Sequence, residues 1–164
     1  MERNLEQIKR EIFDKCNFDI SNFQYDSESR EYDACSFALS GKIIISRNAK
    51  LTPRKAGQFV TFWKRSSSGP IEPFHELDRF DFYIVNARSQ ERFGQFVFPK
   101  TVLVEKGIVS STRKEGKRAF RVYSSWDVVQ NKQAELAQSW QLKYFYEIDK
   151  RVDFEKVKRL YSEI

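Results

Sequence analysis

Residues 80–100, FDFYIVNARSQERFGQFVFPK, predict the centre of the fold. Two runs rich in aromatic and β-branched residues, FDFYIVN and QFVFPK, flank the polar connection ARSQERFG, and this pattern predicts a β-hairpin. Pro99 fits the first turn of a short helix over KTVLVEK, residues 100–106, and Gly107 fits its C-terminal cap. This part of the chain is therefore expected to run strand, strand, helix.

The segments on either side of the hairpin complete the expected order of elements. Apolar residues at helical spacing predict helices at 5–16, 131–148 and 153–164, the last with Asp153 as N-cap and with Phe154, Val157, Tyr161 and Ile164 on one face. Strands are expected at 36–50 (two strands that turn at Ser40-Gly41), 57–65 and 116–126, and loops at 17–33 and 66–74. The sequence predicts an α/β (α+β) fold: a single mixed β-sheet flanked by helices.

Length and composition describe an ordinary globular chain. It has 164 residues, of which 40% are hydrophobic and 32% charged, and 164 residues suffice for one domain with a core. No apolar run approaches the roughly 20 residues that span a bilayer, and the N-terminus lacks the apolar region of a signal peptide. Cys16 and Cys35 have neither metal-ligand nor disulfide-framework spacing. We therefore expect reduced thiols, a cytoplasmic location and no membrane partner.

Charge is segregated along the chain. The formal net charge is +6, from 29 Lys and Arg against 23 Asp and Glu. Residues 47–65 contain no acidic residue and six basic ones: Arg47, Lys50, Arg54, Lys55, Lys64 and Arg65. Residues 113–121 contain five basic residues, Arg113, Lys114, Lys117, Arg118 and Arg121, against the single acidic Glu115. This distribution predicts one basic face on the folded molecule.

Aromatic residues interleave with these cations. On a strand over 57–65, Trp63 and Arg65 share a face, and on the later strand Lys117 and Arg121 do. Cations that neutralise phosphates and aromatic rings on which bases stack are what a nucleic-acid surface needs. The expected contacts are Arg47, Arg54, Lys55, Trp63, Lys64, Arg65, Lys100, Lys117, Arg118 and Arg121. DNA and RNA, single or double strands, all fit. Alternatively, the cations only solvate the surface, or they hold an acidic protein partner or a small anion.

Six pieces of sequence between Thr52 and Trp126-Asp127 resemble the MepB-like family of small bacterial proteins. They are TPRKAGQFVTFWKR, GPIEPF, FDFYIV, GQFVFPK, GIVSS and GKRAFRVYSSWD, in that order, and they cover close to half of the chain. The resemblance implies one MepB-like domain over residues 1–164. The order helix, three strands, helix, strand is also similar to the restriction-endonuclease-like (PD-(D/E)xK) core, which implies a shared fold and raises the question of nuclease activity.

A metal-dependent nuclease of that kind needs two carboxylates on Mg²⁺ and a lysine that orients water or stabilises charge. Asp81 and Lys100 stand at suitable places, but Phe98 occupies the position of the second carboxylate. Glu105 on the next helix would have to supply it, or Glu72, Glu76 or Asp78 from the loop before the hairpin, and none of these has a diagnostic spacing. We therefore expect a non-catalytic nucleic-acid-binding protein without metal or cofactor, with a Mg²⁺-dependent nuclease of rearranged site as the alternative.

Overall fold

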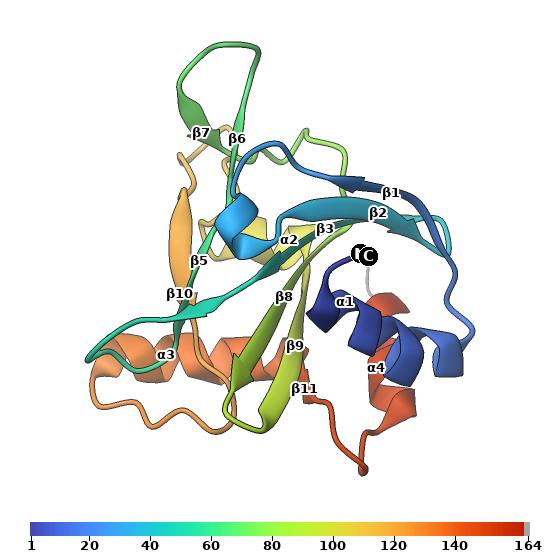
Figure 1. The fold of residues 1–164 in the computed structure, drawn as a ribbon. Coiled ribbons are helices and arrows are strands. Elements are labelled where there is room, and N and C mark those ends of the chain that lie inside the picture. Colours follow the sequence, from blue (N-terminus) through green and yellow to red (C-terminus); the bar gives the residue numbers. More distant parts are fainter. Residues whose placement is uncertain (163–164) are drawn as a thin grey trace.

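A mixed six-stranded sheet forms the centre of the molecule (Figure 1). The computed structural model describes residues 1–162. The strands lie in the order β1 (Ile20–Tyr25), β2 (Cys35–Leu39), β3 (Lys42–Asn48), β8 (Phe82–Ser89), β9 (Arg92–Pro99) and β11 (Phe145–Glu147). Each neighbouring pair is antiparallel except β3 and β8, which are parallel. With helices on the sheet, this is the α+β architecture that the sequence predicts.

The hairpin over residues 80–100 is present as predicted. β8 and β9 pair without interruption from Phe82 opposite Pro99 to Ser89 opposite Arg92. Helix α2 (Lys100–Glu105) follows β9 directly, with Pro99 in the N-cap position. Gly107, with a φ of 72°, ends the helix in the left-handed conformation that favours glycine.

The N-terminal and C-terminal helices cover one face of the sheet (Figure 1). Helix α1 (Arg3–Ile8) continues as a π-helical turn (Lys9–Phe13) and a 3₁₀ turn (Asp14–Cys16), and the predicted apolar face from Leu5 to Cys16 is buried. Helix α4 (Phe154–Ser162) begins after Asp153, whose Oδ1 accepts a hydrogen bond from the Lys156 N–H at 3.1 Å, as the capping prediction requires. Ile164, predicted on the apolar face of α4, lies outside the described residues.

A second aromatic-rich core lies on the other face of the sheet. It is covered by a three-stranded sheet of β10 (Ala119–Val122), β5 (Gln58–Thr61) and β4 (Lys50–Leu51), and by helices α2 and α3 (Lys132–Gln141). Phe62 stacks on Tyr83 with ring centroids 3.9 Å apart. β6 (Trp63–Arg65) and β7 (Ile71–Pro73) form a separate two-stranded arm that projects from the molecule (Figure 1).

The predicted loop at 17–33 is wrong in its first half, because Ile20–Tyr25 pairs with β2 as an edge strand. Only its Ile20 and Phe23 are partly buried, so the alternation that identifies a strand is weak there. The expected loop at 66–74 likewise contains β7, which pairs with β6 despite Pro73. Proline is tolerated at the edge of a two-stranded arm because no further ladder bond is needed.

Two predicted elements are broken into shorter ones. The strand at 57–65 divides at Phe62, whose buried ring enters the second core while its N–H donates to the Arg118 carbonyl at 2.8 Å. The helix at 131–148 ends at Gln141, passes through a 3₁₀ turn and continues as β11. Aromatic residues in 144–146 fit either periodicity, and pairing of Phe145 with Phe96 on the edge of the sheet selects the strand.

Neither cysteine is part of a disulfide among the described residues. Burial raises the pKa of the Cys35 thiol to about 12 and also raises the pKa of Cys16, so both are poor nucleophiles at neutral pH. Within residues 1–162, none of the helices combines the length and apolar character needed to cross a bilayer.

Candidate nucleic-acid interface

A groove of about 790 Å³ opens between β10, the turn at residues 52–57 and helix α3. Figure 1 shows α3 running beneath β10, with the turn beside the N-terminal end of the helix. Its charged lining, within the described part of the chain, is entirely basic: Arg54, Lys55, Lys106, Lys117 and Arg121, with no Asp or Glu. A hollow lined by cations alone concentrates positive potential, because no carboxylate compensates it locally.

Aromatic rings form part of the groove wall. Phe120 packs inward on Phe98, with ring centroids 6.1 Å apart, and Trp140 packs on the same ring at 5.4 Å. Both remain half-buried and line the groove together with Tyr123. The Lys106 Nζ lies 5.6 Å from the centroid of Trp140, which places a cation over that ring.

The turn at 52–57 is fixed against this wall by Arg121. Its guanidinium donates to the Thr52 Oγ1 at 2.8 Å, to the Ala56 carbonyl at 3.1 Å and to the Gly57 carbonyl at 3.2 Å. Gly57 has a φ of 75° and lies so close to Tyr123 that a Cβ atom would be 2.6 Å from the ring. Arg121 thus places the turn that carries the two exposed cations of the groove edge, Arg54 and Lys55.

Four of the predicted contacts therefore meet in the groove: Arg54, Lys55, Lys117 and Arg121. Arg47 does not, because it is only 3% exposed and its guanidinium donates to the Thr61 carbonyl at 2.8 Å and the Trp63 carbonyl at 3.2 Å. The expectation that Arg47 lies on a basic surface is thus wrong. Arg47 instead connects β3 to β5 through the Thr61 carbonyl and to β6 through the Trp63 carbonyl.

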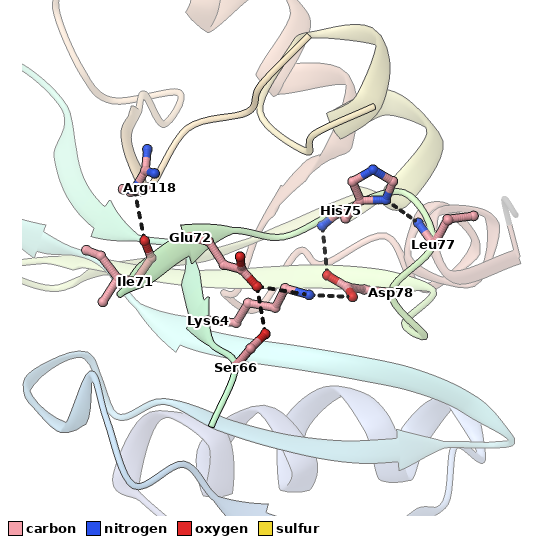
Figure 2. A network of polar contacts seen from close by, with 8 residues as sticks. All are labelled: Lys64, Ser66, Ile71, Glu72, His75, Leu77, Asp78 and Arg118. Carbon is pink, nitrogen blue, oxygen red and sulfur yellow. Dashed lines mark hydrogen bonds and ion pairs between the residues drawn. The ribbon is translucent and has the colours of Figure 1, made fainter. Parts of the chain in front are cut away.

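The predicted cations Lys64 and Arg65 lie on the β6–β7 arm, away from the groove, and are paired with carboxylates. Figure 2 shows the pairs that Lys64 forms. Lys64 Nζ is 2.7 Å from the Asp78 Oδ1 and 3.7 Å from the Glu72 Oε1. The Arg65 Nε is 2.9 Å from the Glu28 Oε1. These ion pairs compete with any phosphate for the same cations, whereas no carboxylate lines the groove within the described residues.

Trp63 and Arg118, two further predicted contacts, also interact with neighbouring residues of the protein. Trp63 is half-buried, with the Arg65 guanidinium 5.6 Å from its ring centroid. Arg118 donates to the Ile71 carbonyl at 3.4 Å, as Figure 2 shows, and to the Glu115 Oε1 at 3.1 Å. The structure thus splits the predicted basic face into a groove and an ion-paired arm.

The nuclease candidates Asp81 and Lys100 are neighbours at the open end of the hairpin, where the Lys100 N–H donates to the Asp81 carbonyl at 3.0 Å, but their side chains have other partners. Asp81 Oδ2 accepts the Ile43 N–H at 2.7 Å, which joins β8 to β3. Lys100 Nζ donates to the Asp78 carbonyl at 2.8 Å and lies over the Phe80 ring. Among residues 1–162, no group of three or more His, Cys, Asp and Glu side chains could hold a metal ion.

The two candidates for the missing carboxylate do not join Asp81. Glu72 accepts a hydrogen bond from the Ser66 Oγ at 2.8 Å on the β6–β7 arm (Figure 2). Glu105 is exposed near the end of α2. The side chain of Phe98 instead continues the second core across the sheet face.

Replacement of Asp81 tests its structural role. We expect Asp81→Ala to lower the free energy of unfolding by about 1–2 kcal/mol, because the part-buried Ile43 N–H loses its acceptor. Asp81→Asn keeps an acceptor oxygen and should unfold within about 0.5 kcal/mol of the wild type. Urea unfolding followed by circular dichroism compares the three proteins. Equal loss in both variants would show that the negative charge, and not the hydrogen bond, is what matters.

Comparison with known proteins places the chain in a family. The model of the MepB-like family matches residues 26–147, about three quarters of the chain. The chain belongs to the MepB-like family. A solved structure described as the crystal structure of MepB is 32% identical, and the match covers 92% of this chain and all of that one with a TM-score of 0.79. No curated protein sequence matches the chain.

A second solved structure is distantly similar to this MepB-like protein: the bacterial homing endonuclease I-Ssp6803I. It is 14% identical, the match covers 84% of each chain, and the TM-score is 0.46. A likeness at this level carries no conclusion about activity, and the restriction-endonuclease-like core stays a sequence-based prediction.

Sequence reasoning missed the part of the groove contributed by α2 and α3. Trp140 on α3 packs on Phe98 and also lines the groove. Lys106 and Tyr123 were not among the expected contacts, since they lie outside the two runs of basic residues. A single basic residue at the end of a short helix, such as Lys106 after α2, carries no local signal for such a groove.

Proposed function

We propose that this MepB-like protein binds nucleic acid through the groove, with limited sequence specificity and without cleaving it. The observation that carries the proposal is the lining of the groove: five Lys and Arg side chains and, among the residues that the structure covers, no carboxylate. Cations of this kind neutralise phosphates, which are the same in every sequence, so affinity gained from them is sequence-independent.

The proposal that the protein is non-catalytic and needs no Mg²⁺ is supported by the way its carboxylates are used. Asp81 is bound to the backbone of β3, and Asp78 is paired with Lys64. A metal-dependent phosphodiester cleavage would need such groups free to converge on one ion. We further propose a cytoplasmic location, which fits the unpaired, buried cysteines.

The double variant Arg54→Ala/Lys55→Ala tests the groove. Both side chains are exposed at its edge, so the fold should be unaffected. We expect binding of fluorescent oligonucleotides to weaken by about tenfold at about 50 mM salt, for all sequences alike. The slope of log K against log salt, measured up to about 200 mM, should fall by about 1.8 for duplex DNA, since each lost phosphate contact removes about 0.9.

Lys150→Ala/Arg151→Ala is the matched control. It removes the same charge from two exposed residues in the turn before α4, which is not part of the groove. Equal weakening in the two double variants would mean that net charge alone drives binding and would contradict the groove as the site. Cleavage of the oligonucleotide in Mg²⁺, lost in Asp81→Ala, would contradict the non-catalytic proposal. Retention of an acidic protein partner without nucleic-acid binding would favour a partner-binding module.

A further inference from the structure

The aromatic wall of the groove adds a second chemistry to its charge. Phe120, Tyr123 and Trp140 are half-buried and line the groove between two groups of cations. Arg54 and Lys55 stand on the turn beside the C-terminal end of β10, where Gln58 pairs with Val122. Lys117 precedes the N-terminal end of β10, and its N–H donates to the Ile108 carbonyl at 2.9 Å, close to Lys106. Phosphate neutralisation alone requires no aromatic residue, so these rings suggest that the ligand also presents flat, apolar faces.

Resting on the proposed function, we propose that the groove binds single-stranded nucleic acid, with bases stacked on Tyr123 and Trp140 and phosphates held by the flanking cations. In a duplex each base face is covered by its neighbour, and the groove side chains would meet only edges and phosphates. A single strand exposes the faces of its bases, and stacking on aromatic rings accepts every base. DNA and RNA single strands share this chemistry.

The position of Tyr123 is fixed before any ligand binds. The Tyr123 N–H donates to the Oε1 of Gln141 at 2.7 Å, and the Gln141 Nε2 donates to the Arg121 carbonyl at 3.0 Å. Gln141 is buried at the end of α3, so these two hydrogen bonds hold the end of the helix against β10 and Tyr123. Gly57 lies against the ring from the side of the turn. A platform held in this way loses little conformational entropy when a base stacks on it.

The N-terminal end of α3 favours a phosphate at one end of the groove. Asn131 caps the helix by accepting the Ala134 N–H at 2.8 Å, and both Asn131 and Gln133 line the groove. The positive end of the helix dipole therefore points into the region that Arg54 and Lys55 border. These cations and the helix end together mark the phosphate side, and the rings of Tyr123 and Trp140 mark the base side.

Four probes of equal length, about 12 nucleotides, separate charge from stacking. They are single-stranded DNA, single-stranded RNA, the DNA duplex, and an abasic DNA strand that keeps every phosphate but has no bases. We expect either single strand to bind about tenfold more tightly than the duplex and the abasic strand at about 150 mM salt. In a Trp63→Phe/Trp126→Phe background, the bound single strand should quench the fluorescence of Trp140.

Tyr123→Leu removes the ring at the open edge of the groove, and Tyr123→Phe preserves it. We expect Tyr123→Leu to weaken single-strand binding by about tenfold and to leave binding of the abasic strand unchanged, with Tyr123→Phe close to the wild type. Thermal unfolding of each variant checks that it is folded. If Tyr123→Leu does not fold, quenching of Trp140 in the Trp63→Phe/Trp126→Phe protein, which keeps Tyr123, still tests stacking.

The outcomes separate this inference from the function on which it rests. Abasic and duplex probes that bind as tightly as the single strands, without quenching, would overturn stacking and leave the groove as a phosphate-binding site. Failure of all four probes to bind would overturn the proposed function itself. Tighter binding of one single strand than the other would support the inference and identify DNA or RNA as the source of the ligand.

Discussion

Replacement of Phe98 by glutamate is expected to unfold the protein and not to create a nuclease. The Phe98 side chain is 0% exposed and its ring lies 5.4 Å from that of Phe96 and 5.4 Å from that of Trp140. Loss of a buried phenylalanine costs about 3–5 kcal/mol, and a buried carboxylate without a partner costs several more. Their sum approaches the whole stability of an ordinary domain, about 5–15 kcal/mol.

Circular dichroism with urea titration measures this outcome, and Phe98→Leu is the matched control. Leucine keeps the site apolar, so we expect a loss of about 1–2 kcal/mol and a cooperative transition. Phe98→Glu should show no native baseline in the absence of urea. A folded Phe98→Glu protein that cleaves DNA in Mg²⁺ would contradict the conclusion, because it would mean that Asp81 and Lys100 can still meet a restored carboxylate.

The hairpin sequence shows that position 98 carries phenylalanine in place of a carboxylate. It does not show which side chains pack on Phe98. Tyr83 and Phe98 face each other in register on β8 and β9. The rings that cover this face come from Phe62, between β5 and β6, and from Phe120 on β10, both outside the hairpin. Periodicity identifies a strand and its two faces, whereas the identity of the layer packed on each face depends on tertiary topology.

The basic residues show the same limit. Their segregation along the chain is visible in the sequence, and it does lead to a basic groove. Lys64 forms an ion pair with Asp78, which lies in the connection between β7 and β8. Arg65 forms an ion pair with Glu28, 37 residues earlier in the chain. Arg47 is buried, and its guanidinium donates to the Thr61 carbonyl of β5. A run of like charge in sequence therefore overestimates the basic surface, because acidic partners arrive from distant segments.

A buried network of side-chain hydrogen bonds lies on the face of the sheet that α1 and α4 cover, and no pattern in the sequence indicates it. Gln95 on β9 is its centre: its Oε1 accepts from the Tyr146 hydroxyl at 2.7 Å and from the Tyr161 hydroxyl at 2.5 Å. Its Nε2 donates to the Asn86 Oδ1 at 2.9 Å, and the Asn86 Nδ2 donates to the Asn48 Oδ1 at 3.0 Å. Burial raises the pKa of both tyrosines well above the ordinary value, so both remain donors.

Gln95→Leu should therefore be among the most destabilising substitutions that preserve side-chain size. Leucine fills nearly the same volume, but two phenol hydroxyls and the side-chain Oδ1 of Asn86 lose their partner inside the core. Each unsatisfied buried group costs about 1–3 kcal/mol, so we expect the free energy of unfolding to fall by about 4 kcal/mol. Urea unfolding at neutral pH gives this value, and a loss below about 1 kcal/mol would contradict it.

The triple variant Gln95→Leu/Tyr146→Phe/Tyr161→Phe separates the polar network from the packing. It removes the two hydroxyls that the single change leaves without an acceptor, and buried polar pairs replaced together by apolar groups of similar shape cost little. We expect it to recover about 2 kcal/mol of the loss relative to Gln95→Leu alone. No recovery would mean that the leucine itself does not fit between β9, β11 and α4. Because Tyr146 lies on β11 and Tyr161 on α4, recovery would show that one glutamine fixes how the C-terminal elements dock on the sheet.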